Sequence, residues 1–158
     1  MSSASPFGFR EALACFASGV TVATVLASDG TPHGLTVSAF TSVSFQPPMI
    51  LICIDYGCAF LQYFRASTHF AVNVLAESQR DLSAIFSEKP EGRFDGVDWR
   101  NGLTGAPLLA GCLANVECRV SSIIEAGDHA VFLAEVEAAQ VEGGEPLLYF
   151  NRAYRKLA

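Results

Sequence analysis

The sequence is poor in charge, and in basic residues above all. Only 16% of its 158 residues are charged, and ten lysines and arginines stand against sixteen aspartates and glutamates, giving a formal net charge of −6. Binding to nucleic acid through counterion release needs clustered Lys and Arg, whereas the basic residues here are scattered along the chain. The composition therefore argues against a nucleic-acid partner and favours a small molecule or another protein.

Long apolar runs and a targeting segment are also missing. No apolar stretch reaches the roughly 18 to 20 residues that a membrane-spanning helix needs. The first residues, Met1 to Pro6, lack the basic stretch followed by an apolar one that marks a secretory signal. We therefore expect no membrane partner and a cytoplasmic location.

The chain has few residues suited to hold a metal or to form disulfides. Its five cysteines form no CxxC pair, and its three histidines lie far apart in sequence. Zinc sites usually combine closely spaced Cys and His ligands. We expect the cysteines to be reduced, buried small apolar residues in a reducing compartment, and we predict no metal site.

Several catalytic motifs are absent as well. The sequence contains no GxGxxG that opens a helix after a strand, so a Rossmann nucleotide site is not indicated, and it contains no GxSxG, which disfavours a hydrolase of that type. It has no internal repeat and no linker, and its length fits a single domain over residues 1–158. Half of the residues are apolar, twelve of them Phe, so some apolar surface is expected to remain for oligomerisation.

What is present is a succession of short apolar, β-branched segments separated by turn residues. These predict strands over residues 20–27, 35–45, 49–54, 69–75, 113–124, 130–141 and 147–150. Asp29-Gly30, between the first two of these segments, is typical of a hairpin turn. Ser5-Pro6 followed by Phe9, Leu13, Phe16 and Ala17 at helical spacing predicts a short amphipathic helix that stops at Gly19. Further helices are predicted over 59–65 and 78–86, with Ser78 as N-cap of the last, and residues 87–111 are expected to form a long surface loop. This order predicts a mainly β protein with a few short helices, folded as a closed antiparallel barrel.

The segment from Leu35 to Phe45 carries the strongest functional signal. In a strand, successive side chains point to opposite faces, so the even positions would present a row of hydroxyl groups without a carboxylate. The row consists of Thr36, Ser38, Ser42 and Ser44, with Phe40 among them. A solvent-facing strand would explain the row too, but such faces usually include Lys and Glu. We interpret the row as a surface for a flat anionic ligand.

Six separate motifs, in order along nearly the whole chain, resemble the flavin reductase domain family with an FMN-binding split barrel. They are Phe16 to Val22, Gly34 to Ser44 followed by Pro47-Pro48, Val72 to Glu77 with Gln79, Arg93-Phe94, Gly127-Asp128-His129, and Pro146 to Phe150 with Tyr154. The family includes the reductase partners of two-component flavin-dependent monooxygenases. The resemblance implies a split β-barrel of antiparallel strands and an NAD(P)H-dependent enzyme that transfers hydride to FMN or FAD.

The resemblance also implies which residues meet the two cofactors. Those implied for flavin are Thr36, Val37, Ser38, Ala39, Ser42, Val43, Ser44, Cys53, Ile54, Asp55, Asn73, Val74, Leu75, Gln79, Phe86, Arg93 and Phe94. Those implied for the nicotinamide are His129, as a contact or a proton donor, with Tyr149, Phe150 and Tyr154. A homodimer and a partner monooxygenase follow from the same resemblance.

Charge considerations refine the expected phosphate site. An anionic cofactor in an acidic protein needs local positive charge, which makes Arg93 and Arg10 candidates for the phosphate. Many family members place Ser or Thr in the loop after the third strand, where this chain has Asp55-Tyr56-Gly57-Cys58. Asp55 would repel a phosphate, although backbone N–H groups around Gly57 offer another donor.

Two alternatives to a reductase remain open at this stage. One is a barrel of the same type that carries flavin without oxidising nicotinamide, and the other is an enzyme of a different class, such as a hydrolase. The choices between FMN and FAD and between NADH and NADPH are open as well.

Overall fold

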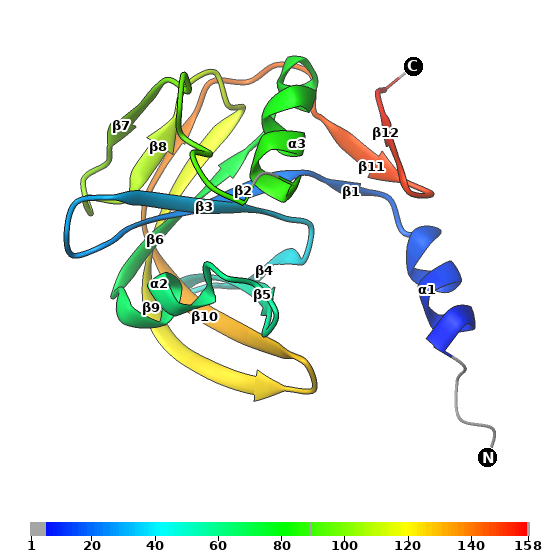
Figure 1. The fold of residues 1–158 in the computed structure, drawn as a ribbon, viewed down its shortest axis with the longest axis horizontal. Helices are drawn as coiled ribbons and strands as arrows, with labels where there is room; N and C mark the ends of the chain where they lie inside the picture. The colour runs from blue at the N-terminus through cyan, green and yellow to red at the C-terminus, as the bar shows by residue number, and fades with distance from the viewer. Residues whose placement is uncertain (1–5, 89, 158) are drawn as a thin grey trace.

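A seven-stranded antiparallel sheet organises the molecule (Figure 1). The structure is a computed structural model that describes residues 6–88 and 90–157. The spatial order of the strands is β3-β2-β6-β9-β10-β5-β4. Their bounds are Thr21–Leu26 for β2, Pro32–Val37 for β3, Phe40–Phe45 for β4, Pro48–Asp55 for β5, His69–Val74 for β6, Ala114–Ala126 for β9 and His129–Val141 for β10.

The sheet curls into a barrel that stays open along one line. β3 and β4 occupy its two outer edges, yet only Ser38 and Ala39 separate them in sequence. Two residues span too short a distance to join edges of a flat sheet, so the edges must approach each other. Ser38 and Ala39 therefore mark the split of the barrel, and the predicted fold class is confirmed.

The single strand predicted over residues 35–45 is wrong. β3 ends at Val37, where it pairs with β2, and β4 begins at Phe40, where it pairs with β5. A continuous strand could not change partners in this way without the turn at Ser38 and Ala39. The alternation of side chains is broken there and again at a bulge near Val43, so the hydroxyl groups do not form one row.

The interior of the barrel is filled by aromatic and branched side chains. Phe64, Phe70 and Phe132 are at most 1% exposed, with ring centroids 6.1–6.4 Å apart. Phe132 contacts the other two rings edge to face, and the rings of Phe64 and Phe70 are tilted by 55°. Phe64 comes from α2, Leu61–Ala66, which was predicted and which closes one end of the barrel. A second apolar cluster lies outside the sheet, under α3.

The helix α3, Arg80–Glu88, was predicted, but its start differs from the prediction. Ser78 does not cap it, because residues Glu77–Gln79 form a short 3-10 turn that precedes it. The side-chain Oε1 of Gln79 instead accepts a hydrogen bond from the backbone N–H of Ala76 at 3.0 Å. The capping oxygen therefore comes from the amide of Gln79 rather than from a serine hydroxyl.

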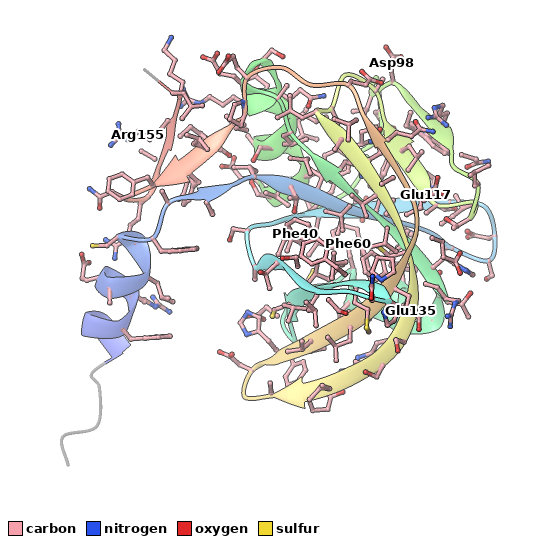
Figure 2. All side chains as sticks on the ribbon, turned by 180° about the vertical axis from the view of Figure 1, so that it is seen from behind. Phe40, Phe60, Asp98, Glu117, Glu135 and Arg155 are labelled. Atoms are coloured by element: carbon pink, nitrogen blue, oxygen red, sulfur yellow. The ribbon has the colours of Figure 1, made fainter. Side chains whose placement is uncertain are left out.

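The segment predicted as a loop over residues 87–111 contains a hairpin. It consists of β7, Trp99–Asn101, and β8, Pro107–Leu109, and all three residues of β8 are buried. Glu117 of β9, labelled in Figure 2, holds the turn between them. Its carboxylate, 2% exposed, accepts hydrogen bonds from the N–H of Leu103 at 3.1 Å, and from the N–H and hydroxyl of Thr104 at 2.7 and 2.8 Å.

An arm extends away from the barrel on the side of the two termini (Figure 1). It contains α1, Pro6–Ala14, and a three-stranded sheet formed by β1, Ser18–Gly19, β11, Leu148–Phe150, and β12, Ala153–Arg155. β12 was not predicted. Helix α1 ends earlier than predicted, and Phe16 is 76% exposed rather than packed inward. Among the described residues, no helix is long and apolar enough to cross a membrane.

Candidate functional site

A groove runs along the split, between the barrel and the arm. Two pockets of about 540 and 530 Å³ lie on either side of Ser38 and share Ser38, Tyr149 and Arg152. We call the two together the split groove. Its other main lining residues are Arg10, Leu13, Phe16, Ala39, Phe40, Leu51 and Phe150 on the side of α1, and Thr36, Arg80, Ser83, Ser87, Glu88 and Tyr154 on the side of α3.

Small side chains and main-chain groups form the floor of the split groove. Ser38 and Ala39 are exposed, so a flat ligand can lie close to the backbone there. β3 is an edge strand, and its Gly34 carbonyl points outward to accept a hydrogen bond from Arg93. In an antiparallel ladder the outward direction recurs every second residue, so the Thr36 peptide points the same way. The edge thus offers main-chain donors and acceptors to a heterocycle.

The split groove is positively charged although the protein as a whole is acidic. Arg10, Arg80 and Arg152 line it, with Glu88 as a counter-charge on the α3 side. The Arg152 guanidinium also pairs with Glu11 at 2.6 Å, and that of Arg80 lies 5.1 Å above the ring of Tyr154. Clustered positive charge in a cleft raises the local concentration of an anionic ligand.

Hydrogen bonds couple the arm and the barrel to α3 across the groove. The hydroxyl groups of Ser83 and Tyr154 lie 2.8 Å apart, and the Thr36 hydroxyl donates to the Ser83 carbonyl at 2.8 Å. Tyr154 also contacts Tyr149, with ring centroids 5.6 Å apart. These contacts position the aromatic side chains of the arm against β3.

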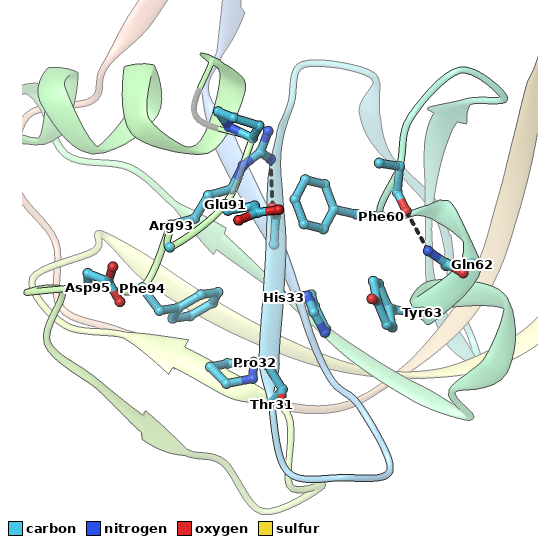
Figure 3. A pocket seen from close by; sticks show the side chains of 14 residues that line it. Thr31, Pro32, His33, Phe60, Gln62, Tyr63, Glu91, Arg93, Phe94 and Asp95 are labelled. Carbon is cyan, nitrogen blue, oxygen red and sulfur yellow. Dashed lines mark hydrogen bonds between the residues drawn. The ribbon is translucent and has the colours of Figure 1, made fainter.

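A third pocket, of about 410 Å³, lies at the other end of β3 (Figure 3). We call it the β3 pocket. Its floor is formed by residues 31–34, one wall by residues 90–95 and the other by α2 with the residues just before it. The named side chains of the walls are Phe60, Gln62, Tyr63, Glu91, Arg93, Phe94 and Asp95.

Arg93 lies at the boundary of the β3 pocket, next to the middle of β3. Its Nη1 donates to the carbonyls of Gly34 at 2.8 Å and Phe86 at 2.6 Å, and its guanidinium carbon lies 4.2 Å from the ring centre of Phe60. Burial lowers the pKa of Arg93 from its usual value, although the group stays charged near neutral pH. The positive charge is therefore fixed in place by two carbonyl groups and an aromatic ring.

The structure brings some of the predicted residues together and separates others. Around the split groove it gathers Thr36, Ser38, Ala39, Tyr149, Phe150, Tyr154 and Arg10, and around the β3 pocket Arg93 and Phe94. Ser42, Val43 and Ser44 lie further along β4 and line neither. The sequence did not predict this division into two sites, because segments that are far apart in sequence meet only in the folded chain.

Asn73 is part of the core rather than of a ligand site. It is 0% exposed, and its Nδ2 donates to the Val22 carbonyl at 2.9 Å and the Thr24 hydroxyl at 3.0 Å. Its Oδ1 accepts from the Leu109 N–H at 3.0 Å and from the Asn115 amide at 2.7 Å. The amide has no hydrogen-bonding capacity left for a flavin, so this prediction is wrong.

Other predicted flavin contacts are also buried in the core. Ile54 is 1% exposed, and Leu75 and Phe86 are 0% exposed. Gln79 uses its amide to cap α3 and to donate to the Ala110 carbonyl. These side chains support the elements around the site, and they line neither the split groove nor the β3 pocket. Three further predicted residues, Val37 at 5% exposure and the half-buried Cys53 and Val74, also line none of these pockets.

His129 and Asp55 face each other at the far ends of β10 and β5. The His129 Nδ1 lies 2.6 Å from a carboxylate oxygen of Asp128, and this hydrogen bond lowers the pKa of Asp128. Asp55 accepts a hydrogen bond from the N–H of Gly57 at 2.6 Å, so that N–H is already used and does not serve a phosphate as predicted. His129 lines neither the split groove nor the β3 pocket, and its contact with the nicotinamide stays a prediction.

Several lining residues were missed. Phe16, Arg80 and Arg152 in the split groove, and His33, Phe60 and Tyr63 in the β3 pocket, were not expected at a site. His33 and Tyr63 stack with ring centroids 3.6 Å apart and planes 9° apart. Aromatic residues on separate segments give no sequence signal, because core packing accounts for them equally well.

Comparison with known proteins places this geometry in a family. The sequence model described as "Flavin reductase like domain" matches residues 13–158. The chain belongs to the flavin reductase like domain family. The relative named "Flavin-dependent monooxygenase, reductase subunit HsaB", from Mycobacterium tuberculosis (strain ATCC 25618 / H37Rv), is 38% identical over 152 residues, covering 94% of this chain and 81% of that protein.

Solved structures of the flavin reductase family share the fold. The NADH:FAD oxidoreductase SgcE6 of Streptomyces globisporus C-1027 has a TM-score of 0.91 and 38% sequence identity, over 100% of this chain and 98% of that one. A "Probable flavin reductase" of Rhizobium meliloti (strain 1021) is 40% identical over 149 residues, which make up 94% of this chain but 48% of the relative. The chain thus spans about half the length of that relative.

Proposed function

We propose that this flavin reductase family member transfers hydride from NADH to a flavin bound in the split groove. The observation that carries the proposal is the groove itself, with small residues and an open strand edge as its floor, aromatic residues on the arm and three arginines around it. Two relatives support the choice of substrates by their names, "FMN reductase (NADH) SmoA" at 38% identity and the "NADH-dependent FAD reductase" at 39%.

The residues of the groove fit a flavin and a nicotinamide. When both are bound, hydride transfer between the two rings is the chemistry of the cofactors, and the protein supplies orientation and a dry surface. Ser38 and Ala39 let a ring lie against the backbone, while Tyr149 and Phe150 cover it and exclude water. Arg80 and Arg152 attract the phosphates. His129 is proposed to contact the nicotinamide from the end of β10.

A direct assay tests this function. Purified protein is mixed with NADH and either FMN or FAD, and the nicotinamide absorbance is followed, with NADPH in a parallel series. We expect NADH oxidation that depends on added flavin and on protein. A protein that turns yellow with flavin but leaves NADH untouched would instead be a flavin carrier, and a protein that binds no flavin would rule out both.

We also propose that the protein is a homodimer. Large apolar side chains on the arm are exposed, with Phe9 at 58% and Phe16 at 76%, and Phe45 at the end of β4 is 88% exposed. Exposed patches of this kind mark association surfaces. Sedimentation at micromolar concentration should give twice the chain mass of 16.8 kDa, and a monomer would contradict the proposal.

A matched pair of variants tests where the dimer forms. Phe9→Glu combined with Phe16→Glu should shift the sedimentation to the monomer, because it places two charges on the arm. Leu103→Glu is the control, since Leu103 is 87% exposed but lies on the turn between β7 and β8. Equal behaviour of the two variants would place the interface elsewhere.

The reduced flavin is proposed to serve a separate monooxygenase. Relatives named as reductase components or subunits of flavin-dependent monooxygenases support this, among them HsaB and the Stachydrine N-demethylase reductase subunit Stc3. We further propose that residues 1–158 act as one domain and work in the cytoplasm, where NADH is available.

A further inference from the structure

Ser83 of α3 lies between the floor of the split groove and the arm. It is 0% exposed, so although it borders the groove it can act on a ligand only through its neighbours. Its carbonyl accepts a hydrogen bond from the Thr36 hydroxyl at 2.8 Å, and its own hydroxyl lies 2.8 Å from that of Tyr154. Ser83 thus contacts β3 through its main chain and the arm through its side chain.

Helix α3 is fixed on β3 independently of the Ser83 hydroxyl. Gly34 of β3 has no side chain, and a Cβ there would lie 2.8 Å from the ring of Phe86, so the helix packs directly against the strand. Arg93 donates hydrogen bonds to the carbonyls of both residues, at 2.8 Å to Gly34 and at 2.6 Å to Phe86. Loss of the Ser83 hydroxyl alone would therefore leave α3 in place on β3.

The arm joins the barrel at Leu147 and contacts α3 through Tyr154. The Leu147 N–H donates to the Leu75 carbonyl at 3.1 Å, and beyond this point β11 pairs with β1 and β12, which belong to the arm itself. The hydroxyl pair of Ser83 and Tyr154 holds β12 to α3, beside the Arg80 guanidinium that lies over the Tyr154 ring. Without the hydroxyl pair, β12 could shift relative to α3.

The position of β12 determines where Tyr149 lies. Tyr149 is opposite Tyr154 in the register of β11 and β12, and their ring centroids are 5.6 Å apart. Tyr149 lines both halves of the split groove and is proposed to cover the flavin ring, while the floor at Ser38 begins two residues after Thr36. Ser83 therefore connects the floor of the groove with its cover.

We propose that Ser83 is a positioning residue for hydride transfer, which keeps Tyr149 at the distance from the floor that brings the nicotinamide and flavin rings together. This inference rests on the proposed function, because it assumes that both rings bind in the split groove. A misplacement of reacting groups by about 1 Å can reduce a rate about 100-fold. A small movement of the arm should therefore slow the reaction without weakening the binding of flavin to the floor.

Single-turnover kinetics test this role. Protein loaded with FMN, or with FAD in a second series, is mixed without oxygen with increasing concentrations of NADH, and the loss of flavin absorbance is followed. The limiting rate reports flavin reduction, and the concentration that gives half of it reports the affinity for NADH. Ser83→Ala should lower the limiting rate at least about tenfold, while the dissociation constant of the flavin, from fluorescence quenching, stays within about twofold of wild type.

Tyr154→Phe deletes the same hydrogen bond from the other side and keeps the aromatic ring. The two single variants and the double variant should all have about the same limiting rate, because changes that remove one shared contact are not additive. If the two effects multiplied in the double variant, the Tyr154 hydroxyl would act on the ligands without Ser83. That result would overturn the inference.

Ser67→Ala is the matched control for the loss of a serine hydroxyl. Ser67 follows α2, where its hydroxyl donates to the His69 carbonyl at 2.7 Å, and it lines neither the split groove nor the β3 pocket. This variant should keep the wild-type limiting rate even if its melting temperature falls as far as that of Ser83→Ala. The comparison separates positioning from a general loss of stability.

The outcomes distinguish this inference from the proposed function. A Ser83→Ala protein with the wild-type limiting rate would overturn the inference and leave the proposed function standing. A loss of flavin affinity in Ser83→Ala would overturn it as well, whatever the rate, because Ser83 would then support the floor. A wild type that binds flavin but is not reduced by NADH would overturn the proposed function, and this inference with it.

Discussion

Replacing Ser38 with tryptophan should lower flavin-dependent NADH oxidation at least about 100-fold while the protein stays folded. Ser38 is exposed and is shared by both halves of the split groove. An indole at this position would fill the space above the floor where the flavin ring is proposed to lie. Misplacement of reacting groups by about 1 Å can already reduce a rate about 100-fold. Initial rates of NADH oxidation at saturating flavin measure the effect.

The matched control for this variant is Ser122→Trp. Ser122 is likewise exposed, but it lies on β9 and lines neither the groove nor the β3 pocket. It should keep the wild-type rate, and both variants should keep the wild-type circular dichroism spectrum and melting temperature. A Ser38→Trp protein that still turns over within about threefold of wild type would place the flavin elsewhere and refute the proposed site.

Local sequence patterns predicted the strands that pair with neighbours in a regular way. β2, β5, β6, β9 and β10 were all anticipated, because their apolar and β-branched residues reflect burial on the barrel side. In the structure β2 pairs with β3 across the turn at Asp29-Gly30, and Gly30 has a φ of 84°. In such strands the local preference of the residues and the tertiary packing both favour a strand.

Predictions from the sequence failed for segments whose structure depends on tertiary contacts. Residues 35–45 have the composition of one strand, and nothing local shows that the two halves belong to opposite edges of a sheet. β8 is buried because it packs beside β6 and β2. Its sequence, Pro107-Leu108-Leu109, lies within a stretch rich in Gly, Pro and charge. Strand pairing over long sequence separations is not encoded in the pattern of either partner alone.

The site was predicted where it coincides with motifs of the family resemblance, which also include Tyr149, Phe150 and Tyr154 on the arm. Thr36, Ser38 and Ala39 were found because the resemblance covered their segment without interruption. Asn73 fitted the same resemblance but serves the core, since a buried amide must satisfy its own hydrogen bonds before it can recognise a ligand. The arginines of the groove come from three separate segments, so their convergence is visible only in the fold.

Replacing Glu117 with alanine should lower the free energy of unfolding by about 3 kcal/mol. The variant removes the buried carboxylate that accepts three partly buried hydrogen bonds from Leu103 and Thr104, and hydrogen bonds to a charged group are worth about 1.5 to 3 kcal/mol. It also opens a cavity beside Gly102, where a Cβ would overlap the carboxylate. Urea unfolding at pH 7 measures the loss. Glu142→Ala, which removes an exposed carboxylate, should change stability by less than about 0.5 kcal/mol.

The effect of Glu117 should depend on pH in a defined direction. Burial raises the pKa of Glu117, but the hydrogen bonds from Thr104 and Leu103 outweigh burial and hold the pKa below the ordinary value of 4.5. The unfolded chain therefore takes up the proton first as the pH falls, so the stability that the carboxylate provides is complete above pH 4.5 and is lost as the pH falls through the native pKa. The difference in unfolding free energy between wild type and Glu117→Ala should shrink in acid. An equal difference at neutral and acidic pH would show that the lost side-chain volume, and not the charged acceptor, stabilises the turn between β7 and β8.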